Sequence, residues 1–356
     1  SYEPDDVLQV LESSSMHRAA LILHQQVASS MSAASSLSAA TVSQHFGHAV
    51  DCYVEDDDEQ FRLEVFSYVK RTCIGASENV QRPFREVLID KITSLCHLSA
   101  DMTARLVGDL FSDQVDVVIQ RLGENPSDQF NFLHSIDSGN LALSLDLTQE
   151  QSRTYVALMA RLHPDMVYDF LSSNDSYDRD ECLALSERYD IPDARVYLLE
   201  KQGSVKKAVD VGLTTLVNHL IDFKRIIRNS DPDLRSAHGD ANHPLKQHER
   251  LQSQIRKMLV VLLDICERNS EGRGSSIWFT VLDRLMKLKS SLRLGSEHRR
   301  HAQFLAKIIS DLNRLAMQRM IASVPLPDLV QKFTSKDAGS ELGEVREGIE
   351  RLLSTY

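Results

Sequence analysis

The chain has 356 residues, 42% of them hydrophobic and 26% charged, with 14 glycines, 9 prolines and a net charge of −11. This balance excludes a wholly disordered chain, and the acidic excess argues against nucleic acid as the main partner, because basic surfaces bind phosphate groups. Turns rich in Gly and Pro, which β-sandwiches and propellers need about every 8–12 residues, are too few, so the composition favours helices.

The first part of the chain shows apolar residues spaced three or four positions apart, which predicts helices. These helices are expected after Pro4 and over His17–Val27, Phe61–Ile74 and Gln81–Ser99. The small, polar segment Ser29–Ala40 is typical of a loose linker or a weak helix end. The acidic run Glu55–Glu59 is interpreted as a helix start rather than a calcium loop, because it lacks the glycine that such a loop needs.

Two segments in the middle of the chain can be laid over each other. Thr103–Val115 aligns with Thr154–Val167, and in each a short helix ends in Leu before a Ser-Asp or Pro-Asp pair opens the next helix. A third helix is predicted after each, at Ser127–Ile136 and at Asp178–Tyr189. The repetition predicts a stack of helical hairpins.

A tight helical hairpin is predicted over Pro192–Leu213. Pro192 begins its first helix, and Gly203 supplies the left-handed cap that a tight turn requires. The small side chains of Ala194 and Ala208 would let the two helices approach closely.

The segment Arg228–His248 lacks periodicity and is predicted to be an exposed loop. Helices are expected beyond it around Ile255–Cys266 and over Ser275–Leu288, Glu297–Ile321, Pro327–Phe333 and Glu341–Leu353. The predicted fold is therefore an all-α solenoid of stacked helical hairpins. Residues 1–227 form its acidic hairpins, 228–248 the loop and 249–356 a basic helical segment.

We find no catalytic or metal-binding motif in the sequence, whether a phosphate-binding loop, a dinucleotide fingerprint, a nucleophile elbow or HExxH. The cysteines have no C-x-x-C spacing and are predicted to be reduced core residues: Cys52, Cys73, Cys96, Cys182 and Cys266. Gly272–Ser276 is a possible anion site and His298 with His301 a possible metal site. A flexible turn and a surface helix are the simpler interpretations.

Two further features concern the core and the membrane. Trp278 is predicted to fill the core rather than to anchor an interface. The start of the chain is acidic and has no signal peptide, and the longest apolar run, Met258–Leu263, is far shorter than a spanning helix. We therefore expect membrane contact to be peripheral.

The segment Ala194–Gly203, followed by Ala208, resembles a clathrin-heavy-chain-type helical repeat. Coat proteins share this repeat with the vacuolar protein sorting subunits of endosomal tethering complexes. Further motifs resemble the CORVET-specific vacuolar protein sorting subunits, those numbered eight in the series: Cys266–Ser270, Trp278-Phe279, and Leu342–Arg346 with Leu352-Leu353.

The resemblance implies a large protein with an amino-terminal β-propeller, a long α-solenoid and a carboxyl-terminal RING finger. The sequence shows neither strand-rich blades nor C-x-x-C ligands, so we expect a stretch of solenoid between them. The implied role is a non-enzymatic, cofactor-free scaffold in a tether that binds class C core subunits. Through the full-length protein, the tether would also bind an early-endosomal Rab GTPase. The implied location is cytoplasmic, peripheral on early endosomal or vacuolar membranes.

The uneven charge suggests where a partner binds. Between Lys246 and Ile321 there are 15 Lys and Arg against 7 Asp and Glu, so the remainder carries −19. Arg299, Arg300 and Lys307 are predicted to bind an acidic partner, with solvated helix faces as the simpler alternative. Two other functions stay open: a coat-type self-assembling solenoid, and a helical enzyme or small-molecule binder with a pocket between hairpins.

Overall fold

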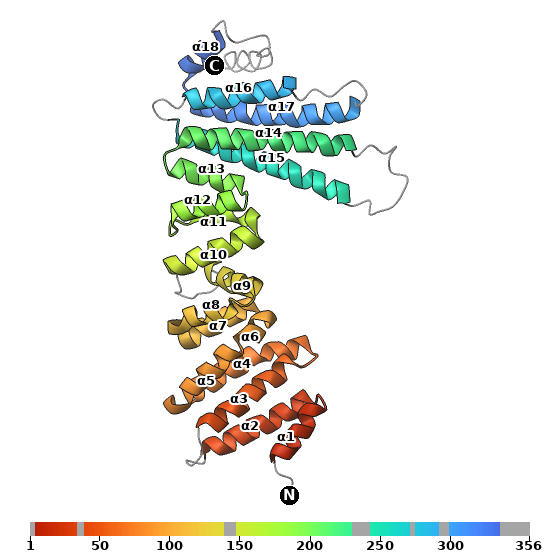
Figure 1. Cartoon of the computed structure of the whole chain (residues 1–356), viewed down its shortest axis with the longest axis vertical. Coiled ribbons are helices and arrows are strands. Elements are labelled where there is room, and N and C mark those ends of the chain that lie inside the picture. The colour runs from red at the N-terminus through yellow and green to blue at the C-terminus, as the bar shows by residue number, and fades with distance from the viewer. Residues whose placement is uncertain are drawn as a thin grey trace. The chain divides into compact units, whose positions relative to one another are not determined.

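The computed structural model describes residues 4–33, 39–138, 147–229, 243–270, 275–291 and 299–334. All regular elements among these residues are helical, which confirms the predicted all-α solenoid of helical hairpins (Figure 1). The chain divides into two compact units, unit 1 (Ser1–His163) and unit 2 (Pro164–Tyr356).

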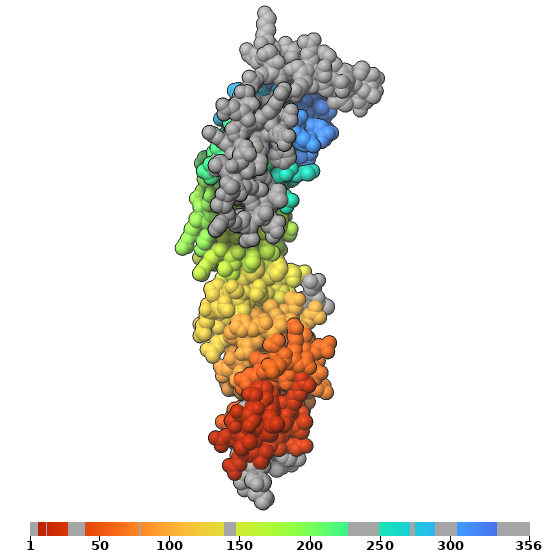
Figure 2. Space-filling view, turned by 90° about the vertical axis from the view of Figure 1, so that its right-hand side faces the viewer, coloured from red at the N-terminus to blue at the C-terminus, as the bar shows by residue number. Residues whose placement is uncertain are grey.

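Unit 1 is a series of short helices, each packed on its neighbours. They are α1 (Pro4–Ser13), α2 (His17–Ala33), α3 (Ala39–Val54), α4 (Glu59–Gly75), α5 (Glu78–Asp90), α6 (Ile92–Leu98), α7 (Ala100–Phe111), the 3₁₀ turn η1 (Ser112–Gln114), α8 (Val115–Leu122), α9 (Pro126–Asp137) and α10 (Gln149–Leu162). The central helix α3 packs on α2, α4 and α5. Figure 2 shows successive stretches of unit 1 following one another in chain order.

The acidic run before α4 starts that helix, as predicted. The side chain of Asp58 accepts hydrogen bonds from the backbone amides of Gln60 and Phe61, and it thereby caps the helix amino terminus. The same run also ties two hairpins together, because Arg18 on α2 donates to Asp56 at 3.0 Å and to Asp58 at 2.9 Å.

Two features of unit 1 differ from the sequence prediction. The helix predicted over Gln81–Ser99 is two helices, α5 and α6, because the backbone at Lys91 leaves the helical conformation. Apolar periodicity continues across this break and so conceals it. The helix α3 was missed altogether, since it already begins at Ala39 within Ser29–Ala40. The alternative prediction for that segment, a helix end, is confirmed, because α2 extends to Ala33. Residues 34–38 lie outside the described residues.

Stacked aromatic rings fill the core of the first hairpins. The ring centroid of Phe46 on α3 lies 4.2 Å from that of Phe84 on α5 and 6.0 Å from that of Tyr68 on α4. The Tyr53 and Phe61 rings stack at 4.9 Å. Such pairs add to the free energy gained by burying the rings.

Unit 2 combines short hairpins with long helices. Its elements are the 3₁₀ turn η2 (Pro164–Met166), α11 (Val167–Ser173), α12 (Arg179–Arg188), α13 (Pro192–Lys201), α14 (Val205–Asn229), α15 (His243–Arg268), α16 (Ser275–Ser291), α17 (Arg299–Ser323) and α18 (Leu326–Thr334). Helix thus occupies both ends of the segment predicted as a loop, 228–248, whereas residues 230–242 lie outside the described residues. The helix predicted at Glu341–Leu353 lies outside them too. The charge-based division of the chain stays a prediction.

The predicted hairpin over Pro192–Leu213 is present. Gly203 has a φ of +78°, which confirms the left-handed cap after α13. Ala194 and Ala208 are both fully buried where α13 packs on α14. Gly212 on α14 permits a second close approach, because a Cβ atom there would lie only 2.5 Å from Leu262 on α15.

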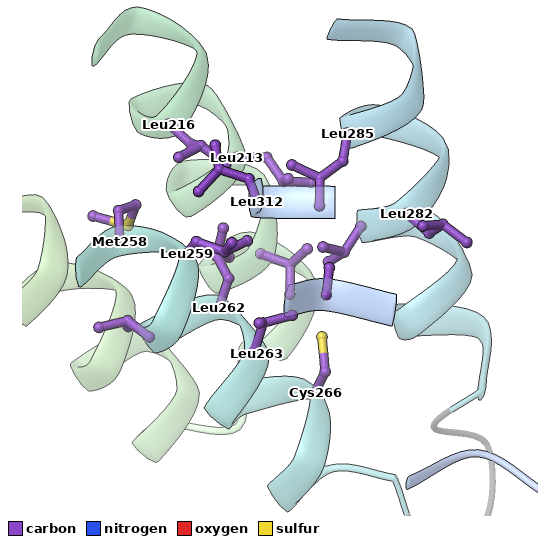
Figure 3. Packing of buried hydrophobic residues seen from close by; sticks show 14 of the residues in the cluster. Leu213, Leu216, Met258, Leu259, Leu262, Leu263, Cys266, Leu282, Leu285 and Leu312 are labelled. Atoms are coloured by element: carbon purple, nitrogen blue, oxygen red, sulfur yellow. The ribbon is translucent and has the colours of Figure 1, made fainter. Parts of the chain in front are cut away.

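One continuous aliphatic cluster joins the long helices of unit 2 (Figure 3). Leucines from four helices converge in it: Leu213 and Leu216 from α14, Leu259, Leu262 and Leu263 from α15, Leu282 and Leu285 from α16, and Leu312 from α17. Trp278 on α16 belongs to the cluster and is 1% exposed, which confirms that it is a core residue.

Candidate partner-binding surfaces

The basic site predicted at Arg299, Arg300 and Lys307 lies at the beginning of α17. The helix buries Leu305, Ile308, Ile309, Leu312, Ala316 and Met320. Lys307 is exposed and, among the described residues, makes no ion pair, so its ammonium group is available to a partner. The side chains of Arg299 and Arg300 lie outside the described residues.

Unit 2 contains a groove of about 510 Å³. It is lined by α14, by α15 and by the turn before α13. Helix α14 contributes Thr215, Asn218, His219 and Asp222, which are spaced as one helical face. The other walls consist of Arg250, Gln254, Lys257 and Met258 on α15, Tyr189–Asp193, and Pro164 with Asp165.

Lys257 anchors the short hairpins of unit 2 to α15 at this groove. Its ammonium nitrogen lies 3.0 Å from the Asp193 carboxylate and 3.9 Å from that of Asp169, and it donates to the Asp165 carbonyl at 3.1 Å. It also lies 5.3 Å from the Tyr168 ring centroid. The charge of Lys257 is therefore satisfied within the fold.

His219 lies half-buried in the wall of the groove. Burial lowers its pKa, and the nearby carboxylates of Asp222, Asp190 and Asp193 oppose that shift. Its Nδ1 atom is buried and makes no hydrogen bond within the described protein. The ring is therefore neutral at neutral pH and retains an unused hydrogen-bonding atom.

Two of the motifs that carry the resemblance meet in space. Arg268 at the end of α15 donates to Glu200 on α13 through two nitrogens, at 3.0 and 2.6 Å. The side chain of Asn269 donates to the same carboxylate at 2.9 Å. Because the Glu200 side chain is only 8% exposed, this bidentate pair fixes the end of α13 against α15. These motif residues therefore position helices.

The thiols do not form a reactive centre. All five cysteines are free and buried, as predicted for core residues. Burial raises the thiol pKa to about 11 at Cys73 and to about 12 at Cys96, Cys182 and Cys266, so these thiols stay protonated. In the described part of the chain, no three His, Cys, Asp or Glu side chains are grouped to hold a metal ion. The helices described there include none long and apolar enough to cross a membrane.

Sequence reasoning missed the groove. Its residues come from distant segments, such as Asp165 and Lys257, which are 92 positions apart, and only the stacking of hairpins brings them together. One local signal was present: Asn218, His219 and Asp222 lie together on one polar face of the amphipathic helix α14.

The family model described as the Vps41 TPR-like region matches residues 41–234, more than half of the chain. The vacuolar protein sorting-associated protein 8 homolog of Mus musculus is 24% identical over 323 residues, 86% of this chain and 21% of that protein. The homolog of the same name in Drosophila melanogaster is 22% identical over 172 residues, 47% of this chain and 13% of that protein. The chain thus spans about a fifth or less of these relatives. No solved structure gives a significant match.

Proposed function

The chain belongs to the family of the Vps41 TPR-like region, and on that premise we propose that it is a scaffold segment of a vesicle-tethering complex in endosomal and vacuolar protein sorting. The family match over residues 41–234 carries the proposal. The similarity to two vacuolar protein sorting-associated protein 8 homologs supports the finer assignment to a CORVET-like complex. Its partners are then class C core subunits and, through the whole protein, an early-endosomal Rab GTPase. Membrane association is peripheral and mediated by the complex.

The physical basis for a scaffold role is the way that the helices stack. Each hairpin buries its apolar face against its neighbours, so the stack presents rigid side surfaces to partners. In unit 2, Glu200, Arg268 and Lys257 hold the short hairpins against the long helix α15. Such a frame keeps docking residues in fixed register, which lowers the entropy cost of binding.

The docking surface that we propose is the solvent face of α17 around Arg299, Arg300 and Lys307, with an acidic surface of a neighbouring subunit as its partner. The positive charge of this region suits such a partner, because complementary charge speeds encounter and fixes register. Lys307 points away from the helix face that buries Leu305 and Ile308.

The test is binding of the chain to purified class C core subunits. Charge reversal by Arg299→Glu, Arg300→Glu and Lys307→Glu together should weaken binding at least about tenfold at low salt and flatten the salt dependence. The matched control is Lys206→Glu, which reverses an exposed charge at the start of α14 and should leave binding unchanged. Unaltered affinity in the triple variant would refute this docking surface, while absence of any binding by the unaltered chain would refute the scaffold assignment. Concentration-dependent self-assembly in light scattering would favour a coat-type solenoid instead.

A further inference from the structure

The groove of unit 2 has an excess of negative charge that the fold leaves unused. Four carboxylates line it, from Asp165, Asp190, Asp193 and Asp222, against the two cations Arg250 and Lys257. Lys257 is committed to Asp193. Asp222 pairs with Arg225 at 3.3 Å, but both side chains are largely exposed, and such pairs contribute only about 0–1 kcal/mol. Asp190 is exposed and makes no ion pair with any described residue.

A second observation, independent of the charges, points into the same groove. The buried Nδ1 atom of His219 has no hydrogen-bond partner in the described protein, and an unsatisfied buried polar group costs about 1–3 kcal/mol. Asp190, Asp193 and Asp222 line the same groove as this imidazole. A ligand that donates hydrogen bonds and carries positive charge would satisfy His219 and the carboxylates together.

The geometry selects the kind of cation. Among the described residues, no three His, Cys, Asp or Glu side chains are grouped to hold a metal ion, so we do not propose that a metal ion bridges these acceptors. An arginine side chain can bridge them, because its planar guanidinium presents five donors in a fixed fork. The volume of about 510 Å³ exceeds that of one side chain and leaves room for the flanking backbone of a peptide.

We propose that this groove binds an arginine side chain of a partner polypeptide, with the guanidinium between Asp190 and Asp222 and one of its N–H groups donating to Nδ1 of His219. The site is separate from the docking surface on α17 and does not depend on the tethering role. It would recognise a basic segment, whereas the α17 surface recognises an acidic one.

The experiment uses the whole chain with ¹³C-labelled histidine and follows the His219 ring signal by NMR, assigned through His219→Gln. The probe is the peptide acetyl-Ala-Ala-Arg-Ala-Ala-amide. Its matched control replaces the arginine by citrulline, which keeps the shape and removes the charge. We expect the arginine peptide to shift the His219 signal saturably and the citrulline peptide to bind at least about tenfold more weakly.

Protein variants locate the site. Asp190→Asn combined with Asp222→Asn should weaken binding at least about tenfold, whereas Asp210→Asn, an exposed position on α14 outside the groove, should change it less than about twofold. Arg250→Gln should strengthen binding, because it removes a competing cation. Equal binding of the citrulline peptide, no saturable shift, or preference for a phosphoserine peptide would each overturn the proposal. The peptide comparison is made on the unaltered chain, and His219→Gln serves only to assign the ring signal, so a folding defect in a groove variant cannot decide the outcome.

Discussion

The two units are both helical stacks, but they differ in helix length, in charge and in the side chains of their cores. Unit 1 uses helices of 7–17 residues and carries 23 acidic against 11 basic side chains, whereas unit 2 carries 28 against 29. Three helices of unit 2, α14, α15 and α17, are 25, 26 and 25 residues long. Their aliphatic residues join in one cluster, while the first hairpins of unit 1 depend on stacked aromatic rings.

This difference indicates how each unit responds to damage. In unit 1 the ring of Phe46 on α3 stacks with rings on α4 and α5, so we expect its loss to be felt mainly in the helices around α3. The long helices of unit 2 share one cluster, so a cavity there removes contacts from several helices together. The predictions below test this contrast.

The largest effect is expected from Trp278→Ala in unit 2. Truncating a buried aromatic side chain costs about 3–5 kcal/mol, through lost transfer energy and the cavity left behind. Hydrogen exchange should show faster exchange in α14, α15, α16 and α17 together. The matched change in unit 1, Phe46→Ala, should cost a similar amount but speed exchange only in α2–α5. If the two variants speed hydrogen exchange over equally many helices of their units, the proposed contrast between the units is wrong.

A smaller effect is expected where helices approach closely. In Gly212→Ala the new methyl group would lie 2.5 Å from Leu262 Cδ2 and 3.4 Å from Val196 Cγ2, and such overpacking costs about 1–3 kcal/mol. In unit 1, Gly47→Ala meets only Val87 Cγ1, at 3.1 Å. The better helix propensity of alanine should nearly offset that contact. Urea unfolding checks both, and a loss at Gly47 as large as that at Gly212 would contradict the geometry.

The next contrast concerns ion pairs. In unit 2, Glu200→Gln weakens the ion pair between the buried Glu200 side chain and Arg268. We expect the free energy of unfolding to fall by about 1–2 kcal/mol. In unit 1, Asp109→Asn removes the partner of Lys70 at 2.6 Å, but both side chains are well exposed. Exposed pairs contribute about 0–1 kcal/mol, so this change should be nearly neutral and salt-sensitive. If urea unfolding shows the same loss of stability in both variants, burial of Glu200 does not strengthen its ion pair.

The fold could be predicted from the sequence because helix signals are local. Gly203, Asp58 and Pro192 act within one turn of the helix that they end or begin, and each acts there as expected. The missed helix α3 had a signal too, since Val42, Phe46, Ala49 and Tyr53 fall on one helical face and are buried.

The groove could not be predicted in this way. Lys257 contacts the carboxylate of Asp193 and the backbone carbonyl of Asp165, yet nothing local to any of the three residues indicates the others. Their meeting depends on the angles at which successive hairpins stack, which periodicity does not encode. The motif Cys266–Ser270 illustrates the same limit. Its residues Arg268 and Asn269 hydrogen-bond to Glu200, and this structural role becomes visible only once α13 and α15 are packed together.

The smallest effect is expected from pH, and its sign differs between the units. In unit 2, burial lowers the pKa of His219 from 6.5, so the unfolded chain takes up this proton first as the pH falls. Stability is therefore lost below about pH 6.5, down to the lowered pKa. In unit 1, burial raises the pKa of Asp137 from 3.8, so its carboxyl group favours folding at low pH and opposes it as the pH rises through the raised value.

Substitution at His219 separates this effect from the rest of the titration. His219→Gln keeps a polar side chain but cannot be protonated, so its urea midpoint should fall less between pH 7.5 and 5.5 than that of the unaltered chain. The other charges at the groove remain in both proteins and cancel in the difference; they are Asp165, Asp190, Asp193, Asp222, Arg250 and Lys257. NMR titration should place the His219 pKa below that of a free imidazole. A pKa at or above the ordinary value would mean that the three carboxylates outweigh burial, and the groove would then hold an imidazolium that competes with the arginine proposed to bind there.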